Sequence, residues 1–87
     1  MSTFLVDRDL AGISMEDLAA AQQAAIRTSA DHRAQGESVN YMRSVFEPQS
    51  GHCMCLFEAS DSDTVRRVND DAHLPYNSVH EVLDLTP

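Results

Sequence analysis

One short stretch of the chain holds four consecutive side chains that can each bind a soft metal ion: His52, Cys53, Met54 and Cys55. The stretch is apolar and predicts a strand, in which alternate side chains point to opposite faces. The two cysteines would then share one face, and the other two side chains the opposite face, so the four cannot surround one ion. This pattern favours reduced cysteines buried as small apolar residues. The alternative is a metal or redox site on the cysteine pair, with further ligands from elsewhere in the chain.

A second group of candidates is acidic and consists of Asp7, Glu58 and Glu81, with Arg43 as a possible counter-charge. If the first and third strands are neighbours and these side chains share a face, the carboxylates converge. Converging carboxylates bind a cation, raise one another's pKa, or act as general acid and base. The alternative is that Asp7 and Glu58 lie at strand ends in solvent, and that Arg43 forms a simple ion pair.

The histidines and hydroxyls give weaker signals. His80 precedes Glu81 on a predicted strand, so the two side chains point to opposite faces, and His80 either contacts a ligand or is structural. His32 lies near the end of the first predicted helix, where a cation suits the helix dipole. His73 is expected in a loop. Nucleophilic catalysis is not indicated, because there is neither a glycine-framed serine nor a glycine-rich phosphate loop.

The elements that must position these residues follow the order βαββαβ. They are a strand at residues 3–9, a helix after Ser14 that ends before Gly36, strands at 38–46 and 52–59, a short helix capped by Ser60 or Ser62, and a strand at 78–85. This order predicts an α+β domain with the ferredoxin-like fold, in which a four-stranded antiparallel sheet carries two helices on one face. Residues 1–87 are expected to form a single domain.

Charge and hydropathy limit the possible partners. The chain has fourteen acidic residues against six arginines and no lysine, so its net charge of −8 disfavours nucleic acid and acidic membranes. It has no apolar run of the roughly 20 residues that span a bilayer, and no signal-peptide pattern, so we expect a cytoplasmic protein. Two helices cover only one face of the sheet, and the strands are apolar. These features favour a homodimer that pairs through the other face.

Three stretches carry a resemblance to a known family: VDRDLAGIS at residues 6–14, CLFEA at 55–59 and VHEV at 79–82. Together with the length and the order of elements, they resemble the domain-of-unknown-function family 4242, the nickel-binding-protein-like family, over essentially the whole chain. The resemblance implies a ferredoxin-like fold that pairs into a dimeric α/β barrel. At least one relative binds nickel, and no enzymatic activity is generally established for the family.

The resemblance also implies site residues. His80 and Glu81 match the histidine and glutamate of the last-strand motif in the nickel-binding relative, while Glu58 and Cys55 match its third-strand motif. Where that relative has histidines on its first strand, second strand and second helix, this chain has Asp7, Tyr41 and Asn69. Asp7 would bind a metal as a harder oxygen ligand than the imidazole it replaces.

The leading hypothesis is therefore a homodimer that binds a transition-metal ion such as nickel, with ligands or supporting residues drawn from His80, Glu81, Glu58 and Asp7. The alternative is a small-molecule-binding protein or enzyme that uses the cavity of a dimeric α/β barrel, lined by Tyr41, Arg43, Cys55, His80 and Glu58. A third possibility is a structural or regulatory partner domain with no site.

Overall fold

Apolar side chains at every second position of the first strand decide which face of the sheet is covered. Phe4 and Val6 are buried, whereas the residues between and beside them are only partly buried. The third strand alternates in the same way, with Cys53, Cys55 and Phe57 buried. Because alternate side chains on a strand point to opposite faces, one face of the sheet is buried and the other is not.

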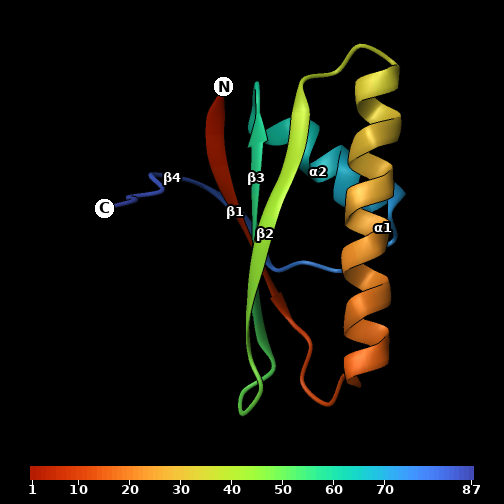
Figure 1. Ribbon diagram of the computed structural model, residues 1–87, viewed down its shortest axis with the longest axis vertical. Coiled ribbons are helices and arrows are strands. Elements are labelled where there is room, and N and C mark those ends of the chain that lie inside the picture. The colour runs from red at the N-terminus through yellow and green to blue at the C-terminus, as the bar shows by residue number, and fades with distance from the viewer.

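The computed structural model describes residues 1–87 and contains six elements. They are β1 (Ser2–Asp9), α1 (Met15–Ala34), β2 (Val39–Glu47), β3 (His52–Ala59), α2 (Ser62–Asp71) and β4 (Ser78–Val82). The strands lie in the order β2-β3-β1-β4, and all neighbours are antiparallel. Both helices lie on the same side of the sheet (Figure 1). This arrangement confirms the predicted ferredoxin-like fold.

Local signals in the sequence set the ends of α1. The hydroxyl of Ser14 accepts a hydrogen bond from the backbone amide of Asp17 at 3.0 Å, as predicted for a helix N-cap. The chain leaves the helix through Gly36, whose φ of 94° lies in the left-handed region that glycine adopts without strain. No helix in the structure is long and apolar enough to cross a membrane.

Two predicted boundaries were wrong. The N-cap of α2 is Asp61 rather than a neighbouring serine, and its carboxylate accepts the backbone amide of Thr64 at 2.8 Å. A carboxylate suits this position because it also complements the helix dipole. The last strand ends at Val82 rather than Leu85, where its pairing with β1 stops at Thr3.

The core fills the space between the covered face and the helices. Its fully buried apolar residues are Val6, Val39, Phe57, Ala59, Val65 and Val68. The two valines from α2 are three positions apart and so lie on one side of that helix. Tyr41 of β2 packs edge-on against Phe57 of β3, with ring centroids 5.5 Å apart. This aromatic contact lies on the covered face of the sheet, beneath α1.

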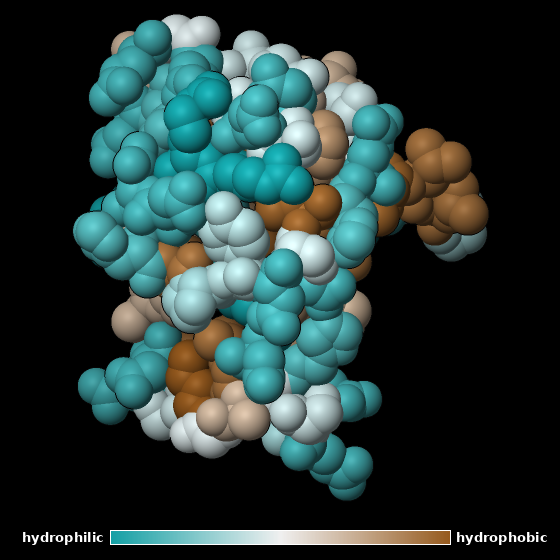
Figure 2. Space-filling view, turned by 180° about the vertical axis from the view of Figure 1, so that it is seen from behind, coloured by the Kyte–Doolittle hydropathy of each residue, from teal (hydrophilic) through white to brown (hydrophobic).

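The segment after β4 is apolar and exposed. Leu83 and Leu85 are 84% and 86% exposed. Figure 2 shows this segment as a mostly hydrophobic projection from the body of the molecule. Exposed leucines that stand together on a projecting segment are typical of a surface that contacts another chain.

His32 joins the ends of the two helices, which is a larger role than the sequence indicated. The residue is buried, with only 6% of its surface exposed. Its Nδ1 contacts a carboxylate oxygen of Glu37, and its Nε2 lies 2.7 Å from Oδ2 of Asp71. Burial lowers the pKa of His32, but the hydrogen bonds to both carboxylates and their charges outweigh it and raise the pKa above the ordinary value of 6.5. Glu37 also binds Arg67 at 2.6 Å, so the network reaches the surface of α2.

This network predicts that the folded state weakens as the pH rises. A histidine whose pKa is raised on folding stabilises the protein fully below its unfolded value of 6.5, and this contribution is lost as the pH rises through the folded value. We expect the free energy of unfolding to fall by about 1–2 kcal/mol between about pH 6 and pH 9, because charged hydrogen bonds contribute this much. Chemical denaturation at each pH would measure it.

The matched variants are His32→Gln and His73→Asn. The first removes the charge from the network and should flatten the dependence above pH 6.5. The second changes an exposed loop histidine with no acidic partner and should keep the dependence. Asparagine suits that position because the backbone there has a φ of 57°. A steep dependence that survives in His32→Gln would assign it to another group.

Candidate functional site

The uncovered face of the sheet carries one histidine–carboxylate contact, between Asp7 of β1 and His52 of β3. Nε2 of His52 touches Oδ1 of Asp7. The two side chains are partly exposed, at 26% for the aspartate and 48% for the histidine. The sequence did not indicate this pair, because the two residues lie on different strands. Only the register brings them together, since Asp9 is the residue directly opposite His52 and Asp7 is its diagonal neighbour.

Glu58 lies on the same face as Asp7 but at the other end of the sheet. It pairs with Thr3 of β1, four residues from Asp7, which corresponds to a separation of about 13 Å along the strand. On its other side Glu58 pairs with Asn40 of β2. The structure therefore does not bring these two predicted ligands together.

His80 and Glu81 point to opposite faces of β4, as predicted. His80 lies opposite Leu5 on the uncovered face, and its Nε2 is 2.9 Å from the hydroxyl of Ser78. Glu81 lies opposite Phe4 and is exposed at the edge of the sheet. Glu81 and Glu58 both line an open hollow of about 500 Å³ beside the C-terminal segment.

A metal centre is not assembled within one chain. No three side chains among the histidines, cysteines, aspartates and glutamates are grouped so that they can hold one ion. Arg43, the predicted counter-charge, lies on the uncovered face and binds Asp84 of the C-terminal segment at 2.7 Å. It lines neither the open hollow nor the cavity on the covered side.

The covered side of the sheet contains an apolar cavity of about 250 Å³ beneath α1. Tyr41 and Cys55, which were predicted to line a pocket, both line this one. A chain of hydrogen bonds runs along its wall. Gln22 of α1 donates to the Tyr41 hydroxyl at 2.8 Å, that hydroxyl lies 2.6 Å from the Ser44 hydroxyl, and Ser44 donates to the Cys55 sulfur at 2.9 Å.

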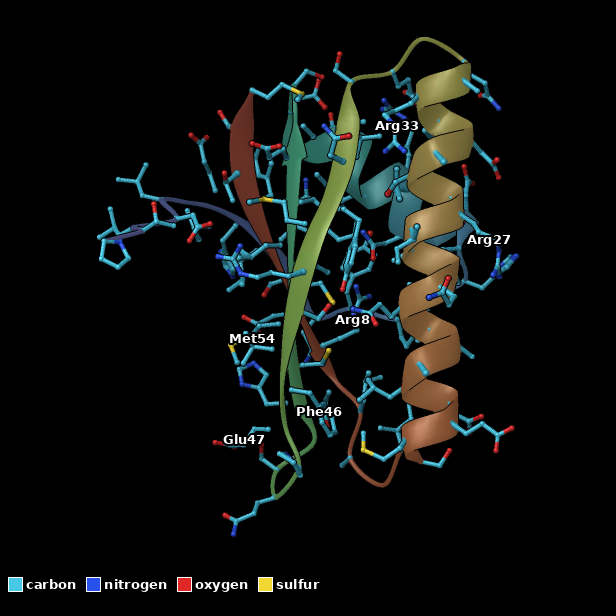
Figure 3. The ribbon with its side chains drawn as sticks, in the orientation of Figure 1. Arg8, Arg27, Arg33, Phe46, Glu47 and Met54 are labelled. Carbon is cyan, nitrogen blue, oxygen red and sulfur yellow. The ribbon has the colours of Figure 1, made fainter.

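Arg8 is the charged residue of this cavity and was not predicted from the sequence. Only 3% of its surface is exposed, and it lies between the sheet and α1 (Figure 3). Its guanidinium donates to the carbonyl of Pro75 at 3.1 Å and to Oδ1 of Asn69 at 2.9 Å. The amide of Asn69 is held in turn by the carbonyl of Val65 at 2.8 Å. The sequence did indicate that Arg8 is buried, because it is the next residue after Phe4 and Val6 in the alternation along β1.

The two cysteines are free and buried, as predicted, and both line the same cavity. Their sulfur atoms are 3.8 Å apart. Burial, followed by the neighbouring Cys55, raises the pKa of Cys53 to about 11, although the nearby Arg8 acts in the opposite direction. A thiol with this pKa stays protonated at neutral pH and is a poor nucleophile. Cys53 therefore does not neutralise the charge of Arg8.

Comparison with known proteins supports the fold described above. The family model described as nickel responsive protein, SCO4226-like, matches residues 4–82. The crystal structure of SCO4226 from Streptomyces coelicolor A3(2) superposes with a TM-score of 0.82 and 27% identity, covering 98% of this chain and all of that one. None of the curated proteins matches the chain. The label of domain-of-unknown-function family 4242 stays a prediction. The match spans nearly the whole length, so the chain belongs to the SCO4226-like family of nickel responsive proteins.

Proposed function

We propose that this chain acts as a homodimer that binds a transition-metal ion, nickel being the first candidate, on the uncovered face of its sheet. The family name supports a link with nickel. The contact between Asp7 and His52 is the observation that carries the proposal, because it supplies the beginning of a ligand set on that face. Mixed imidazole and carboxylate ligands suit nickel, cobalt and zinc better than calcium.

The contact has the chemistry of a supported metal ligand. A histidine that binds a metal through one ring nitrogen commonly donates its other N–H to a carboxylate, which fixes the orientation of the ring. In His52 the contact with Asp7 engages Nε2 and leaves Nδ1 for a metal. Asp7 would then be either a ligand itself or the residue that holds His52 in position.

His80 is the next ligand candidate. Asp7 pairs with Ser78 on β4, and His80 lies two residues further along that strand, opposite Leu5. His52 is displaced from Asp7 in the other direction, opposite Asp9 on β3. The two histidines therefore lie on either side of β1, opposite residues about 13 Å apart along that strand, so His80 would reach an ion at His52 only from a second copy of the chain. Glu58 and Glu81 lie at the far end and would serve a separate position.

A second copy of the chain would complete the ligand set. Four or more ligands are usual for these ions, and two-fold pairing doubles every ligand on the shared face. Partly exposed apolar side chains make this face suitable for pairing: Leu5, Val45, Met54 and Leu56. Leu83 and Leu85 add exposed apolar surface beside it, and burying each in a dimer would contribute about 1.5–3 kcal/mol.

Native mass spectrometry with added Ni²⁺ tests the metal proposal. We expect the mass of a dimer carrying a fixed number of nickel ions. His52→Ala and His80→Ala should each reduce uptake by tenfold or more, roughly the loss that follows removal of one ligand or its support. His73→Asn is the matched control and should bind as the unchanged protein does. Uptake that is lost only when Cys53 and Cys55 are alkylated would place the metal on the cysteines instead.

Sedimentation analysis tests the dimer independently of metal. Replacing both Leu83 and Leu85 with serine should weaken dimerisation by about tenfold or more, because each loses the free energy of apolar burial. Ile26→Ser on α1 is the control, since this residue is 39% exposed on the helix side. Dissociation caused by the Ile26 variant alone, or a dimer unaffected by the leucine changes, would contradict pairing through this region.

A further inference from the structure

The cavity beneath α1 contains a buried cation without an anion. Arg8 lines the cavity with 3% of its surface exposed, and no carboxylate lies within 4.0 Å of its guanidinium nitrogens. No aspartate or glutamate lines the cavity at all. Burying an unpaired charge is costly, and arginine does not escape this cost by losing its proton.

The two hydrogen bonds of Arg8 hold the guanidinium in place without neutralising it. Both acceptors, the Pro75 carbonyl and the Asn69 side-chain amide, are uncharged. They engage two of the five N–H donors of a guanidinium. A guanidinium matches the geometry of a carboxylate, and of the donors that remain at least one lies near the Cys53 sulfur on the cavity wall. The fixed orientation means that an incoming anion would not have to order the side chain.

Most of the rest of the cavity is apolar, and Gln22, Tyr41 and Ser44 are its polar side chains. α1 contributes leucine and several alanines, and Phe46 of β2 lies on the same side of the sheet as Arg8 (Figure 3). The volume of about 250 Å³ has room for roughly ten non-hydrogen atoms, since an engineered cavity of about 150 Å³ takes benzene. A single arginine among apolar walls suits a ligand with one negative charge and a hydrophobic body.

We propose that this cavity binds a small carboxylate with an apolar body, whose carboxylate pairs with Arg8 while the body packs beneath α1. The Gln22, Tyr41 and Ser44 chain lines the same cavity and offers hydroxyl and amide groups to a polar substituent on the body. The site is separate from the proposed metal centre, because Arg8 and Asp7 are consecutive and point to opposite faces of β1. Binding of a carboxylate in this cavity therefore requires neither the metal ion nor the dimer.

Isothermal titration calorimetry on the full chain, with hydrocinnamate and octanoate as probes, tests the proposal. The neutral amide of hydrocinnamate is the matched control, because it keeps the shape and loses the charge. We expect at least one acid to bind with a Kd below about 1 mM, and the amide to bind roughly tenfold to a hundredfold more weakly, as for the loss of a charged hydrogen bond. No binding by either acid, or equal binding by acid and amide, would overturn the proposal.

Three variants locate the binding. Arg8→Met should abolish the preference for acid over amide. Ala21→Leu fills the cavity from α1 and should weaken binding of the acid at least tenfold, even if the Arg8 variant does not fold. Ala20→Leu adds the same side chain at an exposed position of the same helix and should change nothing. Equal affinities in the Ala21 and Ala20 variants would show that the acid binds elsewhere and would refute the assignment.

Discussion

The pairing of β1 between β3 and β4 is the constraint on which both candidate sites depend. As a central strand, β1 has neighbours on both sides, so its register fixes the direction of every side chain. Asp7 and Arg8 are consecutive and are therefore sent to opposite faces. A slip of one residue would exchange them, burying an acid and exposing the arginine. The burial of Phe4 and Val6 prevents that slip, since it would also bring both apolar side chains into solvent.

The cavity exists because α1 faces the sheet with small side chains. Larger side chains at the positions of Ala21 and Ala25 would reach the strands. The two alanines instead leave space between the helix and Cys53. Space of this kind reduces packing contacts and lowers stability, which is a substantial cost in an 87-residue domain. An apolar occupant would restore those contacts. The Cys53 thiol contributes to the same apolar wall, because its raised pKa keeps it neutral.

Much of the fold could be predicted because its signals are local. The order of elements, the Ser14 cap and the facing of the cysteines each follow from a few neighbouring residues. The wrong end of the last strand depended on a distant partner, since β4 ends where its pairing with β1 stops at Thr3. The Asp7 and His52 contact depended on the β1–β3 register, which no single strand encodes. Arg8 was missed for another reason, because charge at a strand end normally indicates solvent and outweighed the alternation that placed it inside.

The distribution of charge separates the two faces chemically. The chain has fourteen acids and six arginines, so a carboxylate partner for every arginine is available in principle. Arg43, Arg66 and Arg67 each have one, and all three lie at the surface. Arg8, the most buried, has none, because no acidic side chain lines the cavity. The excess of acidic residues thus makes the uncovered face suitable for cations, while Arg8 gives the cavity a positive charge. That opposition follows from alternation along β1, and it allows one small sheet to present sites of opposite charge.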